Sequence, residues 1–242
     1  MRAIRPELVV AARYSWRRLG EGPPLVLVHG LAGSWRWWRP LLPPLAREHS
    51  LHLLDLPGFG RLPRARPFVL DAAVEWLSGW FHAAGVDVAD VVGHSLGGLL
   101  SARLAARHPE RVRRLVLVAP AGIPGRAPLA LTTPLAQTIL SARPRFLALL
   151  LRDAARSGPV TIATAALALL TADLRAEAAA VTAPTLVVVG RNDPLVPPAH
   201  GAELVRALPN AMLLELDTGH VPMVERPNEL TRELLSFLRR DA

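Results

Sequence analysis

Short apolar runs alternate with longer segments of helical periodicity along most of the chain. Each run is four or five residues long, is rich in Val and Leu, and is mostly continuous rather than alternating. Continuous apolar runs of this length are typical of strands that are buried on both faces of a parallel sheet. The predicted strands are residues 25–28, 51–54, 88–92, 115–118, 185–189 and 212–216.

Between these runs, apolar positions recur with the period of an amphipathic helix. The clearest predicted helices are residues 36–47, 71–84, 96–107, 199–207 and 228–240. Strands that alternate with helices predict an α/β fold with a mostly parallel sheet. Residues 7–19 alternate more regularly between apolar and polar positions, so they predict an antiparallel strand pair at the edge of this sheet.

The alternation of strands and helices stops between residues 121 and 181. Prolines and glycines open this segment, and helix-like sequence rich in Ala and Leu follows, with no run that fits a strand. We therefore expect a helical insertion that forms a lid over the sheet. The predicted organisation is a core over residues 1–121, a helical cap over 122–180 and the second part of the core over 181–242.

Composition limits the classes of function. The 242 residues suffice for one large core, and the lack of cysteine excludes disulfides and thiolate metal sites. The net charge is +8, but the arginines are scattered and cluster only in pairs, so we expect no nucleic-acid partner. No apolar stretch resembles a signal peptide or a membrane span, which favours a cytoplasmic protein. The sequence leaves the oligomeric state open.

The stretch GHSLGG, residues 93–98, follows a predicted strand and opens a predicted helix. In that setting G-x-S-x-G places a serine on a sharp turn, where small flanking residues avoid the neighbouring strand and helix. Ser95 is therefore the candidate nucleophile, and the backbone N–H of Leu96 can face a developing oxyanion. The adjacent His94 is expected to give structural support, since neighbours at a sharp turn usually point apart.

A serine nucleophile needs a base and an acid that orients the base. His220 follows the last predicted strand and can reach back over the sheet edge to Ser95, and Asp193 follows the strand before it. The chain order Ser95, Asp193, His220 is the one expected of this type of hydrolase. Asp217 is a rival acid but is too close to His220 in sequence to align with the ring, and Asp55 is interpreted as a turn residue.

The second oxyanion donor is expected in the loop after the first parallel strand. The stretch from His29 through Gly33 lies there, so the N–H of Leu31 is the candidate, with Gly30 letting the substrate approach the backbone. Trp35 and Val221 are further candidate substrate contacts, although packing of the first helix explains Trp35 equally well. Apolar cap residues are expected to line an acyl pocket. No metal-ligand spacing is present.

The chain resembles the α/β-hydrolase superfamily over nearly its full length. The matching stretches are LVLVHGLAGS, HLLDLPGFG, VVGHSLGG, TLVVVGRNDPLVP and LDTGHVPMVERP. The resemblance implies an eight-stranded, mostly parallel sheet, a helical cap after the sixth strand, and no cofactor. A serine at position 95 argues against the epoxide hydrolases and haloalkane dehalogenases of the usual type, which use a carboxylate nucleophile.

Within this resemblance, we expect hydrolysis of small carboxylic esters with short to medium acyl chains. The same residues could serve thioester, lactone or carbon–carbon bond hydrolysis, or acyl transfer, because the fold does not choose among these reactions. A non-catalytic ligand receptor on a hydrolase fold is the alternative from another class, and turnover of a generic ester would separate it from an enzyme.

Overall fold

The structure, a computed structural model, describes residues 6–11, 14–124, 137–138 and 143–240. Its centre is an eight-stranded sheet with the order β1-β2-β4-β3-β5-β6-β7-β8, in which β1 and β2 are antiparallel to their neighbours and the other strands run parallel. The α/β fold expected from the sequence is confirmed. The strands are β1 (Glu7–Ala11), β2 (Tyr14–Leu19), β3 (Pro24–Val28), β4 (Ser50–Leu54), β5 (Ala89–His94), β6 (Val112–Val118), β7 (Thr185–Gly190) and β8 (Ala211–Leu216).

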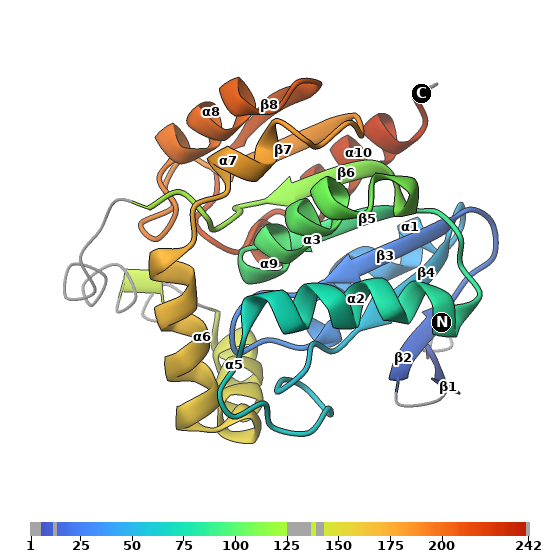
Figure 1. Cartoon of the computed structure of the whole chain (residues 1–242), viewed down its shortest axis with the longest axis vertical. Helices are drawn as coiled ribbons and strands as arrows, with labels where there is room; N and C mark the ends of the chain where they lie inside the picture. The colour runs from blue at the N-terminus through green and yellow to red at the C-terminus, as the bar shows by residue number, and fades with distance from the viewer. Residues whose placement is uncertain (1–5, 12–13, 125–136, 139–142, 241–242) are drawn as a thin grey trace.

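Helices cover both faces of the sheet, as Figure 1 shows with α2 and α3 in front of the strands and α1 and α10 behind them. The α-helices are α1 (Leu42–Leu45), α2 (Leu70–Ala84), α3 (Leu96–Arg107), α5 (Pro144–Ser157), α6 (Pro159–Thr171), α7 (Arg175–Ala178), α8 (Pro198–Ala207), α9 (Pro222–Glu225) and α10 (Pro227–Leu238). Two 3₁₀ helices, η1 (Trp35–Leu41) and η2 (Pro109–Arg111), complete the described elements.

The two faces explain why the parallel strands read as continuous apolar runs. In β3, Val26 and Val28 belong to the apolar cluster under α2 and α3, whereas Leu25 and Leu27 belong to the cluster under η1, α1 and α10. All four side chains are fully buried. Successive residues of a strand point to opposite faces, so a sheet that is covered on both faces needs apolar side chains at every position.

The helix predicted over residues 36–47 is wrong in its type and its continuity. The structure has the 3₁₀ helix η1 there, followed by the single turn α1. Pro40, Pro43 and Pro44 fall inside the segment. Proline lacks the N–H that an α-helix needs and clashes with the preceding turn, so the segment winds more tightly and ends early.

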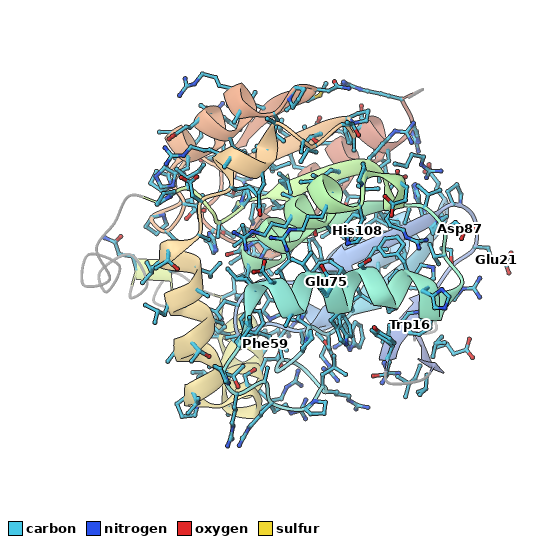
Figure 2. The ribbon with its side chains drawn as sticks, viewed as in Figure 1. Trp16, Glu21, Phe59, Glu75, Asp87 and His108 are labelled. Carbon is cyan, nitrogen blue, oxygen red and sulfur yellow. The ribbon has the colours of Figure 1, made fainter. Side chains whose placement is uncertain are left out.

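Aromatic packing closes the edge of the sheet that β1 and β2 form. The ring of Trp16, which Figure 2 marks on β2, meets the ring of Trp80 from α2 edge to face at 5.6 Å between centroids. His52 of β4 lies beside both rings, at 5.2 Å from Trp80 and 6.4 Å from Trp16. Burial, followed by the charge of the nearby Arg18, lowers the pKa of His52 to about 4. The ring is therefore neutral at neutral pH.

The described part of residues 121–181 holds helices α5, α6 and α7 and no strand. α5 and α6 lie together beside the sheet in Figure 1 and contact the loop that follows β4. The Thr161 hydroxyl donates to the carbonyl of Ala65 at 2.9 Å, and the N–H of Phe68 donates to the Thr164 hydroxyl at 3.0 Å. The cap boundaries 122–180 stay a prediction.

Within the described residues, no helix combines the length and apolar character needed to span a bilayer.

Candidate active site

Ser95 lies at the sharp turn between β5 and α3. Its backbone has φ 52° and ψ −113°, a conformation that non-glycine residues rarely adopt and that is held only where the surroundings enforce it. A Cβ at Gly93 would lie 2.4 Å from the carbonyl oxygen of Gly97, and one at Gly97 would lie 2.4 Å from the carbonyl oxygen of Val28. Glycine at both flanking positions therefore lets α3 start directly against the ends of β5 and β3.

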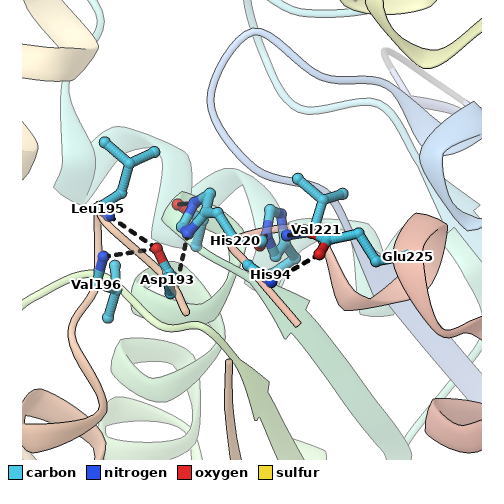
Figure 3. Close-up of polar contacts among 9 residues, drawn as sticks. His94, Asp193, Leu195, Val196, His220, Val221 and Glu225 are labelled. Atoms are coloured by element: carbon cyan, nitrogen blue, oxygen red, sulfur yellow. Dashed lines mark hydrogen bonds and ion pairs between the residues drawn. The ribbon is translucent and has the colours of Figure 1, made fainter. Parts of the chain in front are cut away.

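The structure brings Ser95, His220 and Asp193 together in one chain of hydrogen-bond contacts. Nε2 of His220 lies 3.2 Å from Oγ of Ser95, and Nδ1 of His220 lies 2.7 Å from Oδ2 of Asp193. A carboxylate only accepts, so His220 donates from Nδ1 and keeps the lone pair of Nε2 for the serine hydroxyl. The dashed contact between Asp193 and His220 is visible in Figure 3.

Asp193 is held as a carboxylate. Burial by itself raises its pKa. The charge that His220 carries when protonated, the hydrogen bond from His220 and the backbone N–H groups of Val196 and Leu195 outweigh burial, so the net pKa is lowered. The two N–H groups donate to Oδ1 at 2.8 and 3.0 Å, which leaves Oδ2 for His220 (Figure 3). The loop after β7 therefore fixes both the charge and the orientation of this carboxylate.

The rival acids occupy other positions. The Asp217 side chain is 64% exposed and accepts from Nδ2 of Asn192 at 3.0 Å and from Arg226 at 3.3 Å. Asp55 accepts from the backbone N–H groups of Trp35 and of residue 61 at 2.9 and 3.1 Å. It joins the loops after β3 and β4, which agrees with its interpretation as a turn residue.

The predicted oxyanion donors, Leu31 and Leu96, follow the ends of the neighbouring strands β3 and β5. His29 holds the first of these loops: its Nδ1 donates to the carbonyl of Gly30 at 2.8 Å, and its Nε2 accepts from the N–H of Leu56 at 3.0 Å. Burial lowers the pKa of His29, so the neutral ring can both donate and accept. The role of the two N–H groups stays a prediction.

Cap helix α5 is attached to the same loop, a link that the sequence did not reveal. The Ser34 hydroxyl donates to Oδ2 of Asp153 at 2.5 Å, and both side chains are fully buried. Close by, the rings of Trp37 and Phe146 meet edge to face at 5.0 Å. In the sequence, Asp153 stands out only as the single acidic residue of a helix rich in leucine, alanine and arginine. That pattern does not reveal its buried partner, which becomes apparent only in the folded structure.

A cavity of about 640 Å³ opens beside His220. Its lining combines polar and apolar residues: Gln137, Thr138, Arg143, Phe146, Asn192, Pro194, Asp217, Gly219, His220, Val221, Val224, Glu225 and Arg226. Val221 was a predicted substrate contact and lies in this lining, but Gly30 and Trp35 do not. Trp35 instead packs under the guanidinium of Arg36, at 5.1 Å from the ring centroid, so the cavity gives its predicted role no support.

The apolar acyl pocket expected from the cap leucines is only partly visible. Residues 125–136 and 139–142, which carry several of those side chains, lie outside the described residues. Of the apolar cap residues that are described, Phe146 lines the cavity. Among the described residues, no group of three or more His, Asp or Glu is placed to hold a metal ion.

Comparison with known families gives matches over nearly the whole chain. The family model described as "alpha/beta hydrolase fold" matches residues 23–179, and a second model, described as "TAP-like protein", matches residues 170–239. The first match covers the predicted nucleophile turn and the loop after β3. The second covers the elements that carry Asp193 and His220.

Individual relatives agree with these models. The chain is 33% identical to the pimeloyl-acyl-carrier-protein methyl ester esterase of Aeromonas hydrophila and 32% identical to that of Chromobacterium violaceum, covering 93% of this chain in each case and 98% and 97% of the relatives. The crystal structure of the enol-lactonase from Burkholderia xenovorans LB400 superposes with a TM-score of 0.83 at 27% identity, over 97% of this chain and 100% of that one. The chain belongs to the α/β-hydrolase family.

Proposed function

We propose that this protein hydrolyses carboxylic esters with Ser95 as nucleophile, His220 as general base and then general acid, and Asp193 as the group that orients the base. The observation that carries the proposal is the pair of contacts on the two nitrogens of His220, 3.2 Å to Ser95 and 2.7 Å to Asp193. His220 takes the hydroxyl proton as Oγ attacks the ester carbonyl, and the alkoxide leaves with that proton. Water then cleaves the acyl-enzyme by the same steps.

The backbone N–H groups of Leu31 and Leu96 are proposed to hold the negative oxygen of the tetrahedral intermediate. The N–H groups of a first helical turn have no partner within the helix, so that of Leu96 at the start of α3 is available to a ligand. Donors that are fixed before the reaction stabilise the charge without having to reorganise. This mechanism needs no metal and no cofactor.

The substrate is proposed to be a small ester with a short to medium acyl chain. The relatives named above are methyl ester esterases by name. The cavity beside His220 contributes Arg143, Arg226 and Asn192 as well as apolar atoms. The two guanidinium groups in this lining, those of Arg143 and Arg226, favour an acyl chain that carries a polar or anionic group at its far end. The cytoplasm remains the predicted location, and residues 122–180 the predicted cap.

Replacement of Ser95 by alanine tests the mechanism. Loss of the nucleophile should lower kcat by about 10⁴- to 10⁶-fold with an unchanged circular dichroism spectrum. Ser101→Ala is the matched control, because Ser101 is also a buried serine of the α3 region, on the helix itself. If Ser95→Ala kept more than a tenth of the wild-type turnover, Ser95 would not be the nucleophile.

A panel of methyl esters tests the substrate. The panel varies the length of the acyl chain, and each length is tested with and without a terminal carboxylate or hydroxyl. Each added methylene should stabilise the transition state by up to about 0.8 kcal/mol, so kcat/KM should rise with chain length and then fall once the pocket is full. Polar termini should be preferred at the longer lengths. A profile that keeps rising through long, emulsified chains would indicate a lipase, and faster turnover of a lactone or thioester would assign the site to that bond instead.

A further inference from the structure

The backbone on both sides of His220 is held by one carboxylate. The N–H of Gly219 donates to Oε2 of Glu225 at 2.6 Å, and the N–H of Val221 donates to Oε1 at 3.1 Å. Glu225 ends the single-turn helix α9, which follows the His220 loop directly. Both oxygens are therefore engaged by the peptide groups that flank the proposed base, as Figure 3 shows for Val221.

The carbonyl of His220 is held from the opposite direction by His94. Nε2 of His94 lies 2.8 Å from that oxygen, and a carbonyl only accepts, so His94 donates from Nε2. Burial, followed by the charge of His220, lowers the pKa of His94 to about 3. The ring is therefore neutral at working pH and presents one N–H and one lone pair. The N–H is used on the backbone carbonyl of His220, and Nδ1 has no described hydrogen-bond partner.

The other edge of the His94 ring lies against the loop with the proposed oxyanion donor. A Cβ at Gly30 would lie 2.7 Å from Nδ1 and 3.2 Å from Cε1 of this ring. The ring of Trp37 packs on His94 at 5.8 Å, and the ring of His220 does so at 5.0 Å. His94 thus fills the space between the oxyanion loop and the His220 loop, and its width sets their separation.

We propose that Glu225 and His94 are positioning residues that clamp the main chain of His220 and thereby hold its Nε2 at Oγ of Ser95. The clamp rests on the proposed function, since it acts only if His220 is the base. The hydrogen bond to Asp193 fixes one nitrogen of the ring, but a ring that pivots on that bond can still carry Nε2 away from the serine. Fixing the peptide groups removes this freedom, and a misplacement of about 1 Å can cost about 10²-fold in rate.

Substitutions can remove the clamp in steps. Glu225→Gln keeps the shape but replaces one acceptor oxygen with an NH₂ group, so one of the two bonds is lost, and Glu225→Ala loses both. His94→Phe keeps a ring of similar width and loses the donor. The matched controls are Glu229→Gln, a carboxylate in the first turn of α10, and His82→Phe, an exposed histidine in the last turn of α2.

A positioning role predicts losses in kcat with little change in KM. We expect kcat to fall about tenfold in Glu225→Gln and His94→Phe and about 10²-fold in Glu225→Ala, with KM within about twofold and both controls at the wild-type level. Thermal unfolding and circular dichroism should show that each variant is folded at the assay temperature. If Glu225→Ala does not fold, the two milder variants carry the test, because each keeps most of the packing.

The same substitutions in a His220→Ala background decide whether they act through His220. On the residual hydrolysis of an activated aryl ester, Glu225→Gln and His94→Phe should then cause no further loss. The clamp is refuted if the single variants keep wild-type kcat, if they change KM alone, or if their full cost persists without His220. Activity close to the wild-type level in Ser95→Ala or His220→Ala would instead refute the proposed function itself, which separates the two failures.

Discussion

Replacing Gly97 with alanine should disable the site while leaving the fold in place. Gly97 is the second residue of α3, and its Cα faces the end of β3. An added Cβ would lie 2.4 Å from the carbonyl oxygen of Val28 and 2.5 Å from that of His29. Ordinary contact begins at 3.4 Å, so the two segments must separate by about 1 Å. Both neighbours are backbone atoms and cannot rotate away.

The separation falls between the two proposed oxyanion donors. Leu96 precedes Gly97 on one segment, and Leu31 follows His29 on the other. A donor displaced by about 1 Å no longer reaches the oxyanion, so kcat should fall about 10²-fold, the cost of one lost oxyanion donor. Overpacking should lower the free energy of unfolding by about 1–3 kcal/mol, and the higher helix propensity of alanine should offset this by about 1 kcal/mol.

The assay compares Gly97→Ala with Gly98→Ala. A Cβ at Gly98 would meet the Cβ of Pro120 at 3.1 Å, which needs a shift of only a few tenths of an ångström, and the gain in helix propensity is the same. We expect Gly98→Ala to keep kcat, and urea unfolding to show that both variants are folded. If folded Gly97→Ala has kcat within about threefold of Gly98→Ala, the contact of α3 with β3 does not set the geometry of the site.

Three other substitutions have expected results. Asp193→Asn should lower kcat by about 10⁴-fold at unchanged fold, since an amide favours the wrong tautomer of His220; activity within tenfold of wild type would exclude Asp193 as the orienting acid. His52 is neutral in the folded protein, so its contribution to the free energy of unfolding is fully present above the unfolded pKa of 6.5 and is lost as the pH falls below that value. Between pH 7 and pH 5, the free energy of unfolding from urea titrations should therefore fall by about 2 kcal/mol less in His52→Phe than in the wild type. Equal decreases in the two proteins would contradict this. Asp90 is fully buried, and its carboxylate accepts hydrogen bonds from Nε and Nη2 of Arg113 at 2.9 and 2.6 Å. Asp90→Ala should lower the free energy of unfolding by about 3 kcal/mol. An unchanged urea midpoint would show that the ion pair makes no net contribution to stability.

The sequence by itself determined most of the sheet and much of the candidate site. The predicted parallel strands recur within three residues at each end, and the helix over residues 96–107 has the bounds of α3. A sheet that is covered on both faces imposes apolar residues at every strand position, so its signal is local and strong. The sequence could also predict that Ser95, Asp193 and His220 lie close together, because loops at the carboxyl ends of parallel strands meet at one edge of the sheet.

Only the tertiary structure decided how the side chains around that edge pair. It places Asp193 rather than Asp217 on His220, ties Asp153 of the cap to Ser34, and closes Glu225 onto the His220 loop. Such contacts join residues that are far apart in the chain or that meet only in a particular loop geometry. The hydrophobic periodicity does not predict these contacts, because a polar residue is the same letter in the sequence whether its side chain faces water or a buried partner.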